Sequence, residues 1–183
     1  MPTSDPVLIS PVIYKIIQVQ PKTVLDIGMG MGKWGALVRE YTEAWIGRRF
    51  TRDQWSTVLH GIEVYDAYRN PMWDLYNEIY IGPVQELLPL RGQYDLILMI
   101  DVLEHLEKET GKAVLEELRR HGKFSLVSYS NVDQQDVCPN KLEDHVSKWQ
   151  LEDFLTVQGS PVVQGETWGL IEIPGISRLS NNP

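Results

Sequence analysis

Three glycines at alternate positions follow a short apolar run, and this stretch has the clearest chemical meaning in the sequence. The run, residues 23–27, contains Asp26, and the glycines are Gly28, Gly30 and Gly32. Glycine is favoured where the backbone must take a positive φ or approach a ligand closely. A strand that turns through such a loop into a helix directs free N–H groups and the positive end of the helix dipole at an anionic group. Asp26 adds an acceptor, so the loop suits a ligand that carries both a carboxylate and an ammonium group.

The methionine part of S-adenosylmethionine (SAM) is a ligand of this kind, and it is our preferred interpretation of the loop. A second interpretation is a nucleotide, because residues 30–35 fit the dinucleotide pattern G-x-G-x-x-G. In that pattern the first glycine comes directly after the strand, but here Gly28, which lies before residues 30–35, has that position. Asp26 would also repel a pyrophosphate. A turn that serves only the backbone is the third interpretation.

Bulk composition narrows the class of protein. The chain has 183 residues, of which 43% are hydrophobic and 23% charged, and this predicts one globular domain. A net charge of −8 argues against broad, non-specific binding to nucleic acid, whose backbone is also negatively charged. A single cysteine, Cys138, excludes an internal disulfide, and no stretch approaches the ~20 apolar residues of a membrane span. We therefore expect a cytoplasmic protein without a membrane segment, and the composition leaves its oligomeric state open.

Apolar spacing and capping residues predict an alternation of helices and strands. Ser10 and Pro11 have the residue types of the N-cap and first position of a helix at about 10–20. Ser147 and Gln150 form a capping-box pattern that predicts a helix from about residue 148. Strands are predicted at 23–28, 59–64, 78–82, 94–101 and 124–130, helices at about 34–45, 71–77 and 109–121, and a closing hairpin at 162–164 and 168–173. Residues 21–174 would form the core, with loose ends at 1–6 and 175–183.

This alternation predicts a Rossmann-like, doubly wound α/β sheet that is mostly parallel and ends in an antiparallel hairpin. Ligands of such sheets bind at the carboxyl ends of the strands, where the strand order reverses. The glycine loop, Glu63, Asp101 and Asn131 all follow strands at that edge. We therefore expect them to share one cleft.

Three segments, in order, resemble the class I SAM-dependent methyltransferases, and the resemblance covers about residues 20–173. Residues 25–32 (LDIGMGMG) are similar to the first motif of that family, which holds the methionine part of SAM. Residues 61–63 (GIE) are similar to the second, whose acid takes the two ribose hydroxyls. Residues 94–106 (YDLILMIDVLEHL) are similar to the fourth, which borders the transferable methyl. The resemblance implies that SAM contacts Asp26, Gly28, Met29, Gly30, Gly32, Lys33, Trp34, Glu63, Val64, Asp101, Val102 and Leu103.

One departure from the family pattern concerns the adenine. In many relatives the strand equivalent to 78–82 is followed by Gly-Asp, and the acid contacts the adenine amino group. This chain has Gly82-Pro83 instead. Gln85 or backbone carbonyls are the expected substitutes.

Asp101, Glu104 and His105 form a polar group beside the fourth motif, and His145 precedes the helix predicted at 148. The set resembles the Glu-x-x-Glu-His and later His that hold a divalent metal in small-RNA 2′-O-methyltransferases, with Asp in place of the first Glu. Ubiquinone-pathway O-methyltransferases have a similar Glu-His pair beside their catechol site. The resemblance implies a divalent metal on Glu104, His105 and His145, which would lower the pKa of an accepting hydroxyl. Metal-free acid–base catalysis by His105 or His145, and a purely structural role, stay open.

The acceptor is less well defined by the sequence. The long segments 42–58 and 131–147 are candidate lids. The first carries Arg48, Arg49 and Arg52, which could meet a phosphate or sugar or form a solvated basic turn. We predict a SAM-dependent methyltransferase that acts on an oxygen of a small-molecule or glycan-type acceptor, positioned and deprotonated by Asp101, Glu104, His105 and His145. An NAD-dependent Rossmann enzyme and a non-catalytic SAM-fold module are the alternatives.

Overall fold

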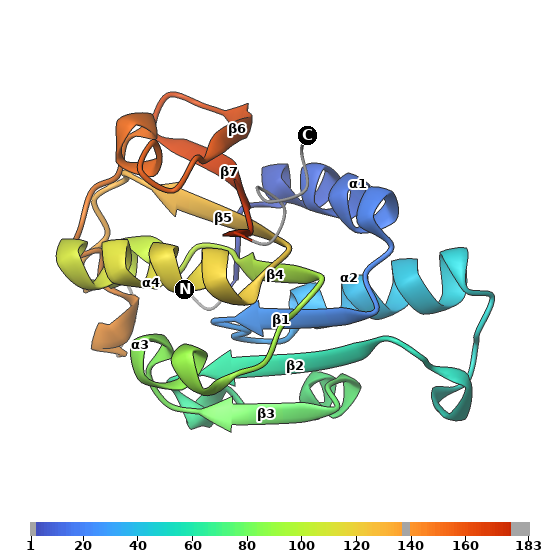
Figure 1. Ribbon diagram of the computed structural model, residues 1–183. Coiled ribbons are helices and arrows are strands. Elements are labelled where there is room, and N and C mark those ends of the chain that lie inside the picture. The colour runs from blue at the N-terminus through green and yellow to red at the C-terminus, as the bar shows by residue number, and fades with distance from the viewer. Residues whose placement is uncertain (1–2, 137–139, 177–183) are drawn as a thin grey trace, which may run out of the picture.

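The computed structural model describes residues 3–136 and 140–176, and their strands form one mixed sheet (Figure 1). Within this part of the chain the strand order is β3-β2-β1-β4-β5-β7-β6. Every neighbouring pair is parallel except those made by β7, which runs antiparallel to β5 and β6. The strands are β1 (Thr23–Ile27), β2 (Val58–Glu63), β3 (Glu78–Ile81), β4 (Leu96–Met99), β5 (Phe124–Ser130), β6 (Ser160–Gln164) and β7 (Trp168–Pro174). The predicted fold class is confirmed.

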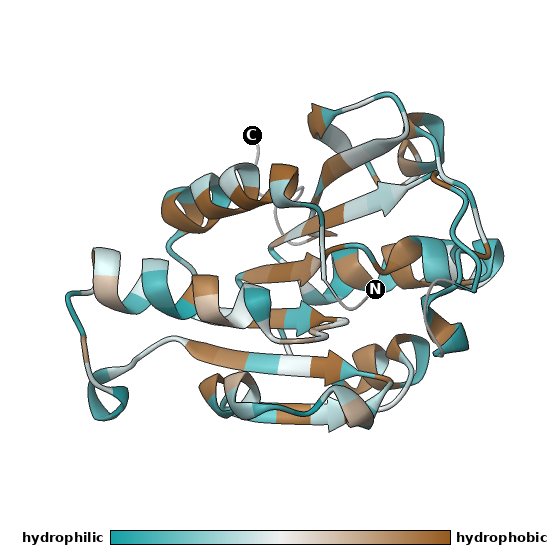
Figure 2. Ribbon diagram, turned by 180° about the vertical axis from the view of Figure 1, so that it is seen from behind, coloured by the Kyte–Doolittle hydropathy of each residue, from teal (hydrophilic) through white to brown (hydrophobic). Residues whose placement is uncertain are grey.

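Helices cover both faces of the sheet, because the strands present side chains alternately to two cores. In β4, Leu96 and Leu98 belong to one core, and Ile97 and Met99 belong to the other. Helices α1 (Ile9–Val19) and α2 (Lys33–Arg39) pack on the first, and α3 (Val84–Leu87) and α4 (Lys108–His121) pack on the second. Figure 2 shows apolar residues concentrated in the central strands and hydrophilic residues in the outer loops. None of the helices in the described ranges has the length and apolar character that a bilayer crossing requires.

The strand order reverses between β1 and β4, which are parallel neighbours. β1 pairs on one side with β2 and on the other with β4, and Ile27 lies opposite both Ile62 and Met99. The carboxyl ends of these three strands therefore meet at one edge. The residues that follow them come from the glycine loop, the end of β2 and the segment after β4.

Two predicted helix starts are wrong. The first helical turn begins at Pro6 as a 3₁₀ helix (Pro6–Leu8), and Asp5 rather than Ser10 caps it by accepting the N–H of Val7 at 2.9 Å. No helix begins at 148. The hydroxyl of Ser147 instead accepts the indole N–H of Trp149 at 2.7 Å.

The conformation around Trp149 is decided by contacts distant in sequence. The Trp149 side chain is fully buried. The backbone N–H of Trp149 donates to Asn131 Oδ1 at 2.8 Å, and the backbone carbonyl of Trp149 accepts from Asn131 Nδ2 at 2.5 Å. This pairing holds the backbone out of a helix. A 3₁₀ helix follows at Leu151–Phe154, and the capping box is formed by Gln150 and Asp153. Cys138 and residues 177–183 of the predicted tail lie outside the described residues.

Candidate active site

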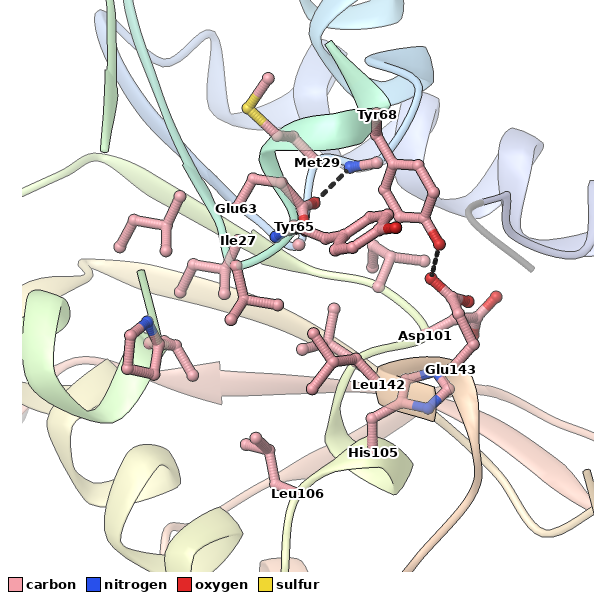
Figure 3. Close-up of a pocket in the computed structure, with 18 of the residues that line it drawn as sticks. Ile27, Met29, Glu63, Tyr65, Tyr68, Asp101, His105, Leu106, Leu142 and Glu143 are labelled. Carbon is pink, nitrogen blue, oxygen red and sulfur yellow. Dashed lines mark hydrogen bonds between the residues drawn. The ribbon is translucent and has the colours of Figure 1, made fainter. Parts of the chain in front are cut away.

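A cavity of about 350 Å³ lies at the carboxyl ends of β1, β2 and β4, where the strand order reverses. Its walls come from the glycine turn, the end of β2, the 3₁₀ helix Leu103–His105 and residues 140–143 (Figure 3). Ten of the residues predicted to bind the donor or acceptor line it: Gly28, Met29, Gly30, Lys33, Trp34, Glu63, Val64, Asp101, Val102 and His105. Asp26, Gly32, Leu103, Glu104, Asn131 and His145 do not.

The glycine turn needs its glycines for its backbone conformation. Gly28, Gly30 and Gly32 have φ values of 69°, 49° and 85°, in the left-handed region that side chains disfavour. A Cβ on Gly28 would also lie 2.3 Å from Cγ2 of Val102. The N–H of Gly28 donates to the carbonyl of Ile62 at 2.8 Å, which ties the turn to β2.

Glu63 faces the glycine turn. Its side chain is buried, with Oε2 accepting the N–H of Gly30 at 2.8 Å and Oε1 accepting the N–H of Tyr65 at 2.9 Å. Burial raises the pKa of this carboxyl, although the backbone hydrogen bonds oppose the rise. Each carboxylate oxygen has a second lone pair, so Glu63 can still accept hydroxyl groups from a ligand in the cavity.

Asp26 lies apart from the cavity. Strand alternation directs it to the side of the sheet covered by α1 and α2, where the hydroxyl of Tyr76 donates to Oδ2 at 2.5 Å. The residue is fully buried, and burial raises the pKa of the carboxyl to about 7. Asp26 therefore contacts Tyr76 inside the protein and does not line the cavity.

Ser4 and Asp5 contact the cavity wall, contrary to the prediction of a loose end for this part of 1–6, of which the structure describes residues 3–6. The ammonium of Lys33 donates to the carbonyl of Ser4 at 2.6 Å, and the indole of Trp34 donates to Ser4 Oγ at 3.0 Å. The N–H of Asp5 donates to Asp101 at 3.3 Å. Burial lowers the pKa of Lys33, and the nearby carboxylates oppose this. No sequence pattern marked these contacts.

Asp101 is held in an unusual backbone conformation at the cavity wall. Its φ is 54°, and it forms a reciprocal pair with Ser128 on β5. The N–H of Asp101 donates to Ser128 Oγ at 2.7 Å, and this hydroxyl donates back to Oδ1 at 2.5 Å. Ser128 was not identified from the sequence, because a buried serine in a strand carries no local signal.

Glu104, His105 and His145 come together behind the cavity, and each offers a ligand atom within 4.8 Å of the others. Nδ1 of His105 lies 3.1 Å from the carbonyl of Asp144, and Nδ1 of His145 lies 2.7 Å from the carbonyl of Val132. A carbonyl can only accept, so both Nδ1 atoms carry a proton, and in the neutral rings both Nε2 atoms present a lone pair. This is the arrangement that metal-binding imidazoles adopt. Asp101 is not part of the group.

Glu104 is the most deeply buried member of this group. Its side chain is buried, and Oε2 has no hydrogen-bond partner among the described residues. Burial, and then the charge of Asp101, raises its pKa well above its usual range. Burial also lowers the pKa of His105. A buried carboxylate oxygen without a partner is costly unless a proton or a cation satisfies it.

The two predicted lids differ. Asn140, Leu142 and Glu143 line the cavity, where Tyr68 donates to Glu143 Oε1 at 2.7 Å. No residue of 42–58 lines it, and this segment lies at the opposite end of the sheet, where the strands begin (Figure 1). Its Arg49 pairs instead with the buried Glu43 at 2.5 Å. The first lid prediction is therefore wrong. Of the second segment, Asn140, Leu142 and Glu143 line the cavity, and its role as a lid stays a prediction.

The turn after β3 contains Gly82-Pro83, where many relatives have Gly-Asp. Gly82, Pro83 and Gln85 all line the cavity, together with Val84. The side chain of Gln85 and the backbone of this turn are thus the available polar groups at that end.

Comparisons with known proteins identify the fold. No model of a protein family matches the chain, and no curated protein matches it. Among solved structures, the N-terminal domain of EvdMO1, in the presence of S-adenosylhomocysteine (SAH) and D-fucose, is 12% identical with a TM-score of 0.62, over 90% of this chain and 80% of that one. The magnesium protoporphyrin IX methyltransferase of Synechocystis PCC 6803 with bound SAH is 13% identical with a TM-score of 0.62, over 92% and 82%. The methyltransferase domain of bacterial CtHen1-C is 16% identical with a TM-score of 0.58, over 92% and 96%. The chain has the fold of the class I SAM-dependent methyltransferases.

Proposed function

We propose that this protein transfers a methyl group from SAM to an oxygen of a small-molecule or glycan-type acceptor. The observation that carries the proposal is the pairing of Glu63 with the N–H of Gly30 beside an open cavity. In this arrangement the turn would hold the amino-acid end of SAM, and Glu63 would accept the two ribose hydroxyls. Lys33, from the same turn, would then face the donor carboxylate.

The acceptor would enter from the side of Asp101 and His105, which both line the cavity. Methyl transfer from a sulfonium is an in-line displacement, so much of its catalysis can come from holding the oxygen close to the methyl carbon. Asp101, Glu104, His105 and His145 would position the acceptor and take its proton. The presence of D-fucose with the EvdMO1 domain supports a sugar-type acceptor among the small hydroxylated molecules.

Glu104, His105 and His145 fit a divalent metal. The two Nε2 lone pairs and the unpartnered Oε2 of Glu104 form a nitrogen–oxygen donor set that suits a borderline cation. Such a cation would lower the pKa of an acceptor hydroxyl. Without it, His105 is the only one of the three that lines the cavity, and it would act as the base.

Glu104→Gln tests the metal site without requiring a known acceptor. The amide has the shape of the carboxyl and cannot ionise, and burial raises the pKa of Glu104, so the melting temperature of the metal-free protein should not fall. We expect the affinity for Co²⁺, measured by calorimetry, to fall at least tenfold because an anionic ligand is lost. Glu109→Gln, at a side chain that is 85% exposed, is the control for net charge. Equal Co²⁺ binding by the wild type and Glu104→Gln would contradict the metal proposal and leave the metal-free base.

Calorimetric titration with SAM and SAH tests the proposed function itself. We expect both to bind, and absence of binding at millimolar concentration would overturn the proposal. A thermal-shift comparison of SAM with NADH separates it from the NAD-dependent alternative. Release of SAH in single-turnover assays with hydroxylated small molecules and glycosides separates an enzyme from a non-catalytic module.

A further inference from the structure

One peptide group, that between Ser4 and Asp5, bonds to two oppositely charged side chains of the cavity. The ammonium of Lys33 donates to the carbonyl of Ser4 at 2.6 Å. The N–H of Asp5, which belongs to the same peptide group, donates to Asp101 Oδ2 at 3.3 Å. Thr3, Ser4, Lys33 and Asp101 all line the cavity. Residues 3–5, which we call the strap, therefore form part of its wall.

The two charged groups are held on opposite sides of this peptide group. The carbonyl and the N–H of a trans peptide group point in opposite directions, so Lys33 and Asp101 approach the strap from two sides. Lys33 is the first residue of α2. Asp101 lies at the cavity wall (Figure 3), and its Oδ1 accepts the hydroxyl of Ser128 at 2.5 Å, which leaves Oδ2 facing the strap. Positive charge thus meets the carbonyl, and negative charge meets the N–H.

The strap is held mainly by hydrogen bonds and buries little of its own surface. Thr3 and Asp5 are exposed, and Ser4 is half-buried. In addition to the two bonds at the peptide group, the indole of Trp34 donates to Ser4 Oγ at 3.0 Å. Segments with few buried apolar groups separate from the rest of a fold at low free-energy cost. The strap can therefore leave the cavity wall while the protein stays folded.

The amino-acid end of the proposed donor has the same arrangement of charge in a stronger form. Its carboxylate would suit Lys33, and its ammonium would suit Asp101. Hydrogen bonds between charged groups are stronger than those that a neutral peptide group makes. Among the described residues, Lys33 is the one lysine or arginine that lines the cavity. The donor carboxylate and the carbonyl of Ser4 would therefore approach the same ammonium.

We propose that the strap is an internal competitor of the donor, and that SAM and SAH displace the peptide group between Ser4 and Asp5 when they bind. This inference rests on the proposed function. Part of the binding free energy of the donor is then used to release the strap, which lowers the apparent affinity. A ligand that has the adenosine but no amino-acid end, such as 5′-methylthioadenosine, leaves the strap in place.

Calorimetry with SAM, SAH and 5′-methylthioadenosine, on protein without an affinity tag, tests this inference. Asp5→Pro removes the N–H that donates to Asp101, and the φ of Asp5, −58°, suits proline. Asp5→Ala is the matched control, because it keeps this N–H and both variants lose the carboxylate that accepts the N–H of Val7. We expect Asp5→Pro to bind SAM and SAH about threefold to tenfold more tightly than Asp5→Ala does. The two variants should bind 5′-methylthioadenosine equally.

Ser4→Ala gives a second, independent measurement. It removes the acceptor of the Trp34 indole and keeps the peptide group, so it should bind SAM and SAH more tightly than the wild type by a smaller factor. Melting temperatures establish that each variant is folded. A crystal structure with SAH should show the strap away from Lys33 and Asp101.

Three results would overturn the inference while leaving the proposed function supported by SAM binding to the wild type. One is equal affinity of Asp5→Pro and Asp5→Ala for SAM. Another is weaker binding by Asp5→Pro, which would mean that the strap closes over the donor. The third is an SAH complex in which the strap keeps both of its bonds to Lys33 and Asp101. A wild type that binds neither SAM nor SAH overturns the proposed function itself.

Discussion

Glu63→Ala is expected to weaken SAM binding at least 100-fold. In the proposed complex the carboxylate accepts two ribose hydroxyls, and hydrogen bonds to a charged group contribute about 1.5–3 kcal/mol each. The substitution also leaves the N–H of Gly30 without its acceptor, which loosens the turn that holds the amino-acid end of the donor. Titration calorimetry with SAM measures the change, and the melting temperature shows whether the variant is folded.

Two comparisons make the Glu63 result specific. Glu63→Gln keeps an acceptor for Gly30 and loses only the charge, so we expect a loss of about tenfold, between the wild type and Glu63→Ala. SAH that lacks the 2′-hydroxyl should bind the wild type more weakly than SAH does. Glu63→Ala should bind these two ligands equally, because it has no carboxylate to accept the hydroxyl. If Glu63→Ala binds SAM as the wild type does, the proposed orientation of the donor is wrong.

Asp26→Asn is expected to stabilise the protein increasingly as pH rises from 4 to 8. Burial raises the pKa of Asp26 from 3.8 to about 7, so between these values the folded protein holds a proton that the unfolded chain has released. The stabilisation from this proton is complete below about pH 4 and is lost as pH rises through 7. The shift corresponds to about 4 kcal/mol of unfolding free energy, at about 1.36 kcal/mol per unit. Asparagine cannot ionise and does not incur this loss.

Urea unfolding at several pH values measures the difference between Asp26→Asn and the wild type. The difference between the two proteins isolates Asp26, because other carboxyls change the pH dependence of stability in the opposite direction. In Glu43 and Asp95, hydrogen bonds and ion pairs outweigh burial and lower the pKa. Tyr76→Phe is the matched variant. It removes the hydrogen bond that lowers the pKa of Asp26, so its stability should keep falling above pH 7. A gain in Asp26→Asn that is the same at pH 4 and pH 8 would contradict the assignment.

The parts of the fold that could be predicted from sequence are those where local pattern and tertiary structure agree. The apolar residues of β4 face two cores, so a continuous apolar run was a reliable sign of a central strand. The glycine turn was predictable because glycine adopts a positive φ more readily than other residues do. Glu63 was placed correctly against this turn because parallel strands end at one edge.

The features that sequence reasoning missed depend on contacts between distant segments. The capping pattern at Ser147 and Gln150 is a valid local signal, but burial of Trp149 and its pairing with Asn131 override it. Ser128 and Tyr68 gain their contacts only when segments far apart in sequence come together. The side chain of Asp26 points away from the cavity because its neighbours in β1 alternate, and the motif alone did not indicate which face it takes.

The contacts of Ser4 and Asp5 bear on how the recombinant protein should be handled. Both residues bond to groups that line the cavity, namely Lys33, Trp34 and Asp101. An affinity tag at the N-terminus would be attached within a few residues of these contacts, and in the proposed complex it would hinder the approach of the donor carboxylate to Lys33. Removing such a tag before any titration ensures that the measured affinities are those of the protein without the tag.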